Sequence, residues 1–337
     1  MSRMGGTGTL KQVLKRGALV TAANWQVVIV QFIADALFKT LLTVPLVGGV
    51  FLVVLLVGGD PTELLSMDPR HAVPAITSIL LAQPIALAAF LAALGLVLGG
   101  GSLLMFLVKG GTVTVLLAGE RSGGALEQPP LRLAAVHRAA SFSLERFTGG
   151  ARLLFARYVR LGLALCAVYL TSAAIYLAIV FGPLRATEQD WTVLAAVASL
   201  ALVGWITAVN FLYLLIQIVI AADECDVRTA VARVGGLLRA ESRTLVLVFG
   251  AILALVTMTT AASILATAAL GLIAFVPLVS LAALPLQLLA WLLRGLVFQF
   301  IALSGLAAYA RVHRGALDRS GAHRHSGPNV HHIGRTA

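Results

Sequence analysis

The chain has 337 residues, of which 59% are apolar and only 12% are charged, and its mean hydropathy is +0.96. Soluble domains carry about a quarter charged residues. The composition therefore excludes a water-soluble globular protein and predicts an all-α, polytopic membrane protein. The net charge of +11 is also typical of nucleic-acid-binding proteins, so the positions of the basic residues have to decide between the two.

Long uncharged runs predict six transmembrane helices, over residues 22–58, 75–118, 153–183, 191–222, 244–275 and 280–310. Each run exceeds the roughly 20 residues that cross a bilayer, so the helices tilt, kink or project. Pro45 predicts a kink in the first span, Pro84 predicts a kink or a start in the second, and Pro277 and Pro285 bracket the turn after the fifth. The same reading gives a basic cytoplasmic amphipathic segment (1–21), a transmembrane domain (22–312) and a disordered tail rich in His and Arg (313–337).

The second run is 44 residues long and contains Gly99–Ser102, so it could also form two short spans. Lys and Arg number four in 1–20, seven in 119–160, four in 222–243 and five in 311–337. Six spans place all four basic segments on one side of the membrane, as the positive-inside rule requires, whereas a seventh span does not. We therefore expect a cell-membrane protein with both termini in the cytoplasm. Its basic segments face anionic headgroups, and it has no nucleic-acid partner.

Three basic, amphipathic stretches each precede a pair of spans, at residues 9–25, 130–147 and 226–241. Apolar side chains recur at helical spacing in each of them, which predicts helices lying along the inner membrane surface with the basic face toward headgroups. The chain then consists of three parallel copies of a surface helix followed by a transmembrane hairpin. The alternative is that any loop before a span becomes basic and amphipathic, and the sequence leaves both open.

The third copy carries a recognisable motif. This copy resembles the bacterial glycerophosphodiester phosphodiesterase membrane-domain family and related six-helix inner-membrane proteins. The resemblance lies in the stretch QIVIAADECDVRTAVARVGGLLRAESRTLVLVFG. In that family a span ends in an acidic residue and is followed by a helix of the form Ala-Leu-x-Arg-Ser-Trp-x-Leu. The last span ends Tyr-Tyr-Asp-x-Arg-x-Arg, and Ala310 stands where the Asp is usual. The positions that match are Glu224, Ala230, Arg233, Leu237, Tyr309, Arg311 and Arg314. The resemblance implies a six-helix membrane module without the soluble phosphodiesterase domain.

Three charges interrupt the spans and form the candidate polar site. Asp35 and Lys39 lie four residues apart, so both face one side of a helix and can pair. Arg294 lies near the middle of the last span, where an arginine should face the bundle interior or a wet cavity. Asp35 is the acidic residue available within another span, so we predict that the first and last spans pack together with Asp35 between Lys39 and Arg294. This cluster of charges is interpreted either as a structural clamp between two helices or as a binding site for an anion or a lipid headgroup.

The remaining features indicate packing. Gly95, Gly99 and Gly100 predict a close helix contact at small-xxx-small spacing. The histidines of the tail suit a solvated basic segment, and we expect no metal or cofactor. Catalytic signatures such as a Walker A loop, a zincin motif or a serine elbow are absent from the sequence, so we expect no enzyme.

The function that follows is a membrane module that assists envelope or lipid homeostasis. The alternative is a transporter or permease for an amphiphile or anion that uses Asp35 and Arg294. A membrane-protein partner or a second copy of the chain stays open.

Overall fold

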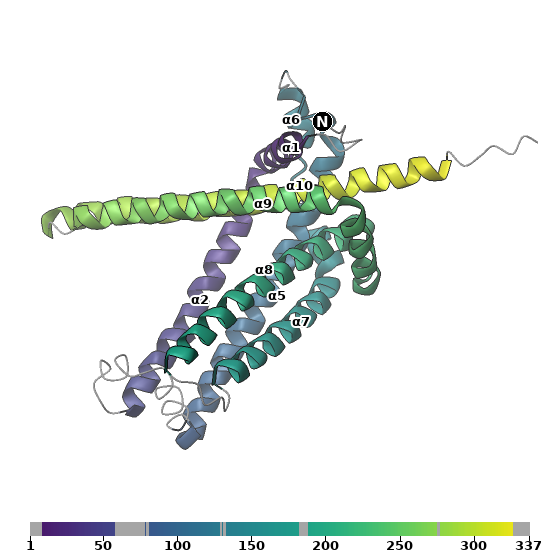
Figure 1. Ribbon diagram of the computed structural model, residues 1–337. Coiled ribbons are helices and arrows are strands. Elements are labelled where there is room, and N and C mark those ends of the chain that lie inside the picture. Colours follow the sequence, from purple (N-terminus) through teal and green to yellow (C-terminus); the bar gives the residue numbers. More distant parts are fainter. Residues whose placement is uncertain are drawn as a thin grey trace, which may run out of the picture. The chain divides into compact units, whose positions relative to one another are not determined.

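The computed structural model describes residues 9–57, 78, 81–128, 130, 133–181, 188–274 and 277–325. All regular secondary structure in this part of the chain is helical, without strands (Figure 1). The helices are α1 (Leu10–Ala23), α2 (Trp25–Val57), α5 (Pro84–Ser122), α6 (Leu133–Ala139), α7 (Leu144–Phe181), α8 (Glu188–Asp223), α9 (Val227–Ala274) and α10 (Pro277–His325).

Six of these helices are long and apolar enough to cross a membrane, which confirms the expected number of spans. The candidate spans are Trp25–Gly49, Pro84–Ser122, Leu144–Phe181, Trp191–Asp223, Val227–Gly271 and Pro285–Arg319. The second run is one continuous helix through Gly99–Ser102 and begins at Pro84. Proline lacks a backbone N–H, and the first N–H groups of a helix have no partner within the helix, so no hydrogen bond is lost there. The seven-span alternative is therefore wrong for this region.

The chain forms two compact units. Unit 1 comprises Met1–Ile29, Gly111–Gly150 and Leu214–Ala337, and unit 2 comprises Val30–Gly110 and Ala151–Tyr213. Unit 1 contains α1, α6, α9 and α10 together with one end of each of α2, α5, α7 and α8.

The helical backbone is interrupted within or at the end of each of the three basic stretches. Asn24 separates α1 from α2, residues 140–143 separate α6 from α7, and Glu241 has non-helical dihedral angles inside α9. The second stretch is thus not one surface helix over 130–147, because α6 ends at Ala139. The repeat of a surface helix and a transmembrane hairpin stays a prediction, which these recurring interruptions favour.

One asparagine joins two of the interruptions. The Asn24 side-chain amide donates to the carbonyls of Val20 and Ala139, and its oxygen accepts a hydrogen bond from the Ser141 backbone. Backbone groups at the ends of α1 and α6 have no partner within their own helix. Asn24, which is fully buried, supplies hydrogen bonds to these groups. The starts of α2 and α7 are held together in this way.

The core of unit 1 contains the close packing of α1 against α10. A side chain at Gly17 would place its Cβ 2.4 Å from the Ser304 carbonyl oxygen, so the two backbones touch at this point. Val20 and Ala307 are fully buried beside this contact. The first and last helices of the described chain therefore pack together through α1, while the predicted packing of the first and last spans stays a prediction.

Unit 2 is held by aromatic side chains over glycines and by a few side-chain hydrogen bonds. Phe38 of α2 covers Gly101 of α5, while a Cβ added at Gly99 or Gly100 would meet nothing within 4 Å. The predicted small-residue contact is thus displaced by one to two residues along α5, because the ring fits where Gly101 faces it. Tyr169 of α7 donates to Asn210 of α8 at 2.6 Å.

Two expectations about the end of the chain are wrong. Helix α10 continues through His325, so residues 313–325 are not a disordered tail. The helix persists because His313 is buried and paired and because Arg319 pairs with Glu241. Pro285 lies inside α10 rather than at a turn. The tail beyond His325 lies outside the described residues.

Candidate functional site

The charged end of unit 1 is built around a buried arginine on α1. Arg16 and Glu120 expose only 4% and 2% of their side chains, and Arg16 Nε lies 2.6 Å from Glu120 Oε2. A second acid, Glu127, lies 2.6 Å from Arg16 Nη1. Arg311 of α10 approaches the same two acids, at 3.7 Å from Glu120 and 4.0 Å from Glu127. We call these four residues the charged cluster.

Backbone carbonyls complete the shell of Arg16. Its guanidinium also donates to the carbonyls of Glu120 and Gly124. Gly124 has φ +60°, a left-handed conformation that glycine adopts without strain just after a helix end. The sequence Gly-Gly directly after α5 therefore turns the chain so that the Gly124 carbonyl and Glu127 both face Arg16.

The surroundings of Arg16 and Glu127 stabilise the charged forms of these two residues. Burial alone would lower the pKa of Arg16, but the hydrogen bonds and charges of Glu120 and Glu127 outweigh it and raise that pKa. Burial alone would raise the pKa of Glu127, but the Arg16 hydrogen bond and the charges of Arg16 and Arg311 leave it below its ordinary value. Both residues therefore stay ionised at neutral pH.

The expected placement of Arg16 on a headgroup-facing surface is wrong. The sequence predicts that the basic residues of 9–25 face lipid headgroups, yet Arg16 points into unit 1 and is among the least exposed charges of the described chain. An unpaired arginine in the protein interior would cost free energy, and the carboxylates of Glu120 and Glu127 offset that cost.

A second ion group forms where α8 ends. The Asp223 carboxylate accepts from Arg233 of α9 and lies 3.1 Å from Nε2 of His313 of α10. Glu224, the acidic residue that matches the family motif, is exposed and has φ +49°. The acid that makes the contacts is therefore Asp223, one position earlier in the chain.

The other motif positions serve packing and pairing. Ala230, Leu237 and Tyr309 are buried, at 0%, 6% and 2% exposure. Arg233 pairs with Asp223, Arg311 belongs to the charged cluster, and Arg314 donates to the Glu120 carbonyl at 3.4 Å. Within unit 1, the motif thus marks residues that join α8, α9 and α10 to the end of α5.

A cavity of about 260 Å³ lies between the two ion groups. Its walls carry both signs of charge, and Ala310 stands in it where the family pattern has an Asp. The lining residues are Leu117, Glu120, Arg121, Ala222, Asp223, Ala310, His313, Arg314, Leu317 and Asp318. The short Ala310 side chain leaves space here that a carboxylate would occupy.

Asp35 and Lys39 pair as the sequence predicts. In unit 2, Lys39 Nζ lies 2.7 Å from Asp35 Oδ2 within α2. The lysine is 69% exposed and the aspartate 24%, so the pair lies at the edge of the unit rather than in its interior. A second lysine of unit 2, Lys109, lies over the ring of Tyr213, 5.4 Å from its centroid.

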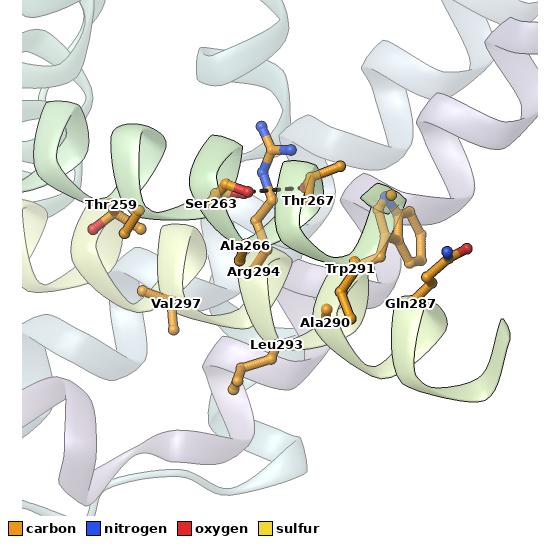
Figure 2. Close-up of a pocket in the computed structure, with 13 residues that line it drawn as sticks. Thr259, Ser263, Ala266, Thr267, Gln287, Ala290, Trp291, Leu293, Arg294 and Val297 are labelled. Carbon is orange, nitrogen blue, oxygen red and sulfur yellow. Dashed lines mark hydrogen bonds between the residues drawn. The ribbon is translucent and has the colours of Figure 1, made fainter. Parts of the chain in front are cut away.

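Arg294 lines a groove between α9 and α10 of unit 1 (Figure 2). The groove has a volume of about 530 Å³, and the guanidinium also lies 5.7 Å from the ring centroid of Phe298. Arg294 and Asp35 belong to different units, so their contact stays a prediction. Among the described residues of unit 1, no carboxylate lies within ion-pair distance of Arg294.

Ion pairing is the main chemistry that these groups can perform. Within the described ranges, no group of three His, Cys, Asp or Glu side chains is arranged to hold a metal ion. Comparison with protein-family models, curated proteins and solved structures finds no match, so the family resemblance stays an expectation.

Sequence reasoning missed Arg16, Glu120, Glu127, Asp223 and His313. A signal for the two span-end acids was present, because Ala-Gly-Glu at 118–120 and Ala-Ala-Asp at 221–223 both end a long apolar run. Aligning the three expected copies at these endings would have placed Ala-Tyr-Ala at 308–310 in the third. The pairing of Arg16 with acids more than 100 residues away had no local signal.

Proposed function

We propose that the protein is a multi-pass membrane module without a catalytic site, and that it assists envelope or lipid homeostasis. It lies in the cytoplasmic membrane, with the charged end of unit 1 and both termini toward the cytoplasm. Its first partner is the bilayer, whose anionic headgroups meet the basic segments.

The mutual pairing of the charges in the cluster is the observation that carries this proposal. Glu120 and Glu127 are both engaged by arginines, and Glu120 is 2% exposed. A general acid or base has to exchange a proton with a substrate, whereas both of these carboxylates are held in ion pairs with arginines. Ion pairs of this kind fix the relative positions of α1, α10 and the end of α5, which is a structural role.

The orientation follows from where the basic segments gather. Helix α1, the end of α5, the start of α9 and the end of α10 all belong to unit 1. A cysteine placed at the exposed Ser143, in a variant lacking Cys166 and Cys225, should react with a membrane-impermeant maleimide only after the cells are permeabilised. Labelling of intact cells would overturn the proposed orientation.

Deletion in the native cell tests the homeostasis role. We expect a changed lipid composition and increased entry of a hydrophobic dye, both restored by the wild-type chain. Restoration should fail with Glu120→Gln, which removes the structural pair, and should succeed with Glu145→Gln, an exposed acid of the same unit. An unchanged envelope after deletion would contradict the proposal.

A transporter or permease for an amphiphile or anion is the second candidate. The open groove beside Arg294 favours it, because transporters expose a charged side chain to a cavity within the membrane. Purified protein in vesicles loaded with a fluorescent anionic amphiphile should then accelerate its release, and Asp35→Asn and Arg294→Gln should abolish that acceleration. Release at the rate of empty vesicles would exclude this candidate for the amphiphile used.

A further inference from the structure

The position of Arg294 along its span does not by itself fix its depth in the membrane. It lies near the middle of the last predicted span, but α10 has 49 residues and is much longer than a bilayer is thick. Depth is better measured from the charged cluster. Arg294 is 17 residues from Arg311, which is about 25 Å along a helix with a rise of 1.5 Å per residue. The hydrocarbon core is about 30 Å thick, so a helix along the membrane normal with Arg311 at the cytoplasmic boundary would place Arg294 near the opposite boundary.

Two side chains that suit a membrane interface lie beyond Arg294 on α10. Trp291 follows one turn further from the charged cluster and Gln287 one turn beyond it, and both line the groove. Tryptophan is enriched where hydrocarbon meets headgroups. An arginine, a tryptophan and an amide thus follow one another along one face of α10.

The facing wall of the groove is polar at regular spacing. Thr259, Ser263 and Thr267 lie four residues apart on α9, so their hydroxyls form one stripe. The Thr267 hydroxyl donates to the Ser263 carbonyl at 2.8 Å, which leaves its oxygen able to accept a further bond. Figure 2 shows the Arg294 side chain extending from α10 toward Ser263 and Thr267.

Apolar side chains complete the groove. Ala262 and Ala266 of α9 and Leu293 and Val297 of α10 also line it. A cation beside hydroxyls and a strip of small apolar residues together match an amphiphile with an anionic head. Arginine is the side chain best suited to phosphate, because its planar fork can donate two hydrogen bonds to the same group.

We propose that the groove between α9 and α10 binds a phospholipid of the leaflet opposite the charged cluster, with Arg294 holding the headgroup phosphate and an acyl chain lying along Ala262 and Ala266. This inference rests on the proposed function, because a module of lipid homeostasis has to contact lipid specifically. The competing possibility is that Arg294 only extends to the interface and selects no lipid.

Quenching of Trp291 fluorescence tests the site directly. Trp25, Trp191 and Trp205 are replaced by Phe so that Trp291 alone reports, and delipidated protein in detergent is titrated with phosphatidylglycerol carrying a brominated acyl chain. We expect saturable quenching. Brominated diacylglycerol, which lacks the phosphate, should bind at least tenfold more weakly. Equal binding of the two lipids would overturn the proposal.

Variants separate the groove from general charge attraction. Arg294→Gln should weaken binding of the brominated phosphatidylglycerol at least tenfold, Arg294→Lys should weaken it less, and Arg243→Gln, which removes an exposed arginine elsewhere on α9, should leave it unchanged. Equal losses in Arg294→Gln and Arg243→Gln would show non-specific attraction and overturn the site. If Arg294→Gln does not fold, Ala266→Phe, which fills the groove, has to abolish the quenching.

Two outcomes identify the source of the phosphate and separate this inference from the function. Inorganic phosphate at millimolar concentration should not compete with the brominated lipid, and competition would overturn the assignment to a phospholipid. The measurement uses purified protein, so absent quenching together with an altered envelope after deletion would refute the lipid site alone. Quenching with an unaltered envelope would refute only the homeostasis role.

Discussion

In unit 1, Arg16 finds its acidic partner Glu120 across 104 residues of chain, whereas in unit 2 Asp35 pairs with Lys39 one turn away in its own helix. Unit 1 buries its charges and satisfies them between helices. The described part of unit 2 joins its helices by ring-to-glycine contacts and by neutral hydrogen bonds such as that of Tyr169. The contrast teaches that the arrangement of unit 1 depends on a few charged residues, while unit 2 depends on shape distributed over many apolar contacts.

Neutralising Glu120 should lower the stability of the protein more than any other single change proposed here. A small effect would contradict the view that charged residues hold unit 1. Glu120→Gln leaves Arg16 buried with a weaker partner, and breaking a buried pair costs about 3–5 kcal/mol. Thermal melting of the detergent-solubilised protein, followed by the loss of the monodisperse peak, should show a large drop. The matched variant Glu145→Gln changes an exposed acid and should shift stability by less than about 0.5 kcal/mol.

Adding one methyl group at Gly17 tests whether α1 is as tightly seated on α10 as the backbone contact implies. The Cβ of Gly17→Ala would meet the Ser304 carbonyl oxygen at 2.4 Å, so α1 has to shift. We expect a loss of about 1–3 kcal/mol in the same melting assay. Gly149→Ala in α7 meets nothing within 4 Å and should be neutral or stabilising. Equal effects of the two changes would refute the close contact.

The corresponding change in unit 2 sharpens the comparison, because a ring can yield where a backbone cannot. Gly101→Ala would place its Cβ 2.1 Å from Phe38, whereas Gly100→Ala next to it meets nothing within 4 Å. We expect Gly101→Ala to cost about 1 kcal/mol, less than Gly17→Ala. A melting temperature for Gly100→Ala as low as that for Gly101→Ala would argue against the Phe38 contact.

Acidification should weaken unit 1 through Glu127. Its pKa is lowered in the folded chain, so its contribution is fully present above the ordinary pKa of about 4.3 and is lost as the pH falls through the folded value. The difference in melting temperature between wild type and Glu127→Gln should therefore be constant from pH 6 to about 7 and shrink below about pH 4. A difference that grows on acidification would contradict the ion pairing.

Removing a hydroxyl from unit 2 should have the smallest effect. Tyr169→Phe deletes the hydrogen bond to Asn210, and interhelical bonds of this kind average about 0.6 kcal/mol in membrane proteins. The melting temperature should fall only slightly. A loss as large as that of Glu120→Gln would show that single polar contacts also govern unit 2, and the contrast between the units would disappear.

Much of the fold could be predicted because periodicity and charge bias are local signals. The six spans follow from uncharged runs, and the Asp35–Lys39 pair follows from helical spacing. The start of α5 at Pro84 follows from the chemistry of proline. Each of these inferences uses residues within one helix or its flanks.

The charged cluster could not be predicted because its members come from distant segments. Nothing near Arg16 in the sequence indicates that Glu120 and Arg311 approach it. The break after Ala139 also had no local signal, because Asn24, more than 100 residues earlier, supplies the hydrogen bonds that the chain loses there.

The contact between Gly17 and Ser304 has a consequence for biosynthesis. Helix α1 is made before α10, and the surface of α10 that receives it follows almost 300 residues later. Until then Arg16 has no Arg311 beside it, and its acids emerge only with the end of α5. Arg16 can therefore meet Glu120 and Glu127 as soon as the end of α5 has been made, whereas the contact of Gly17 with α10 requires a nearly complete chain.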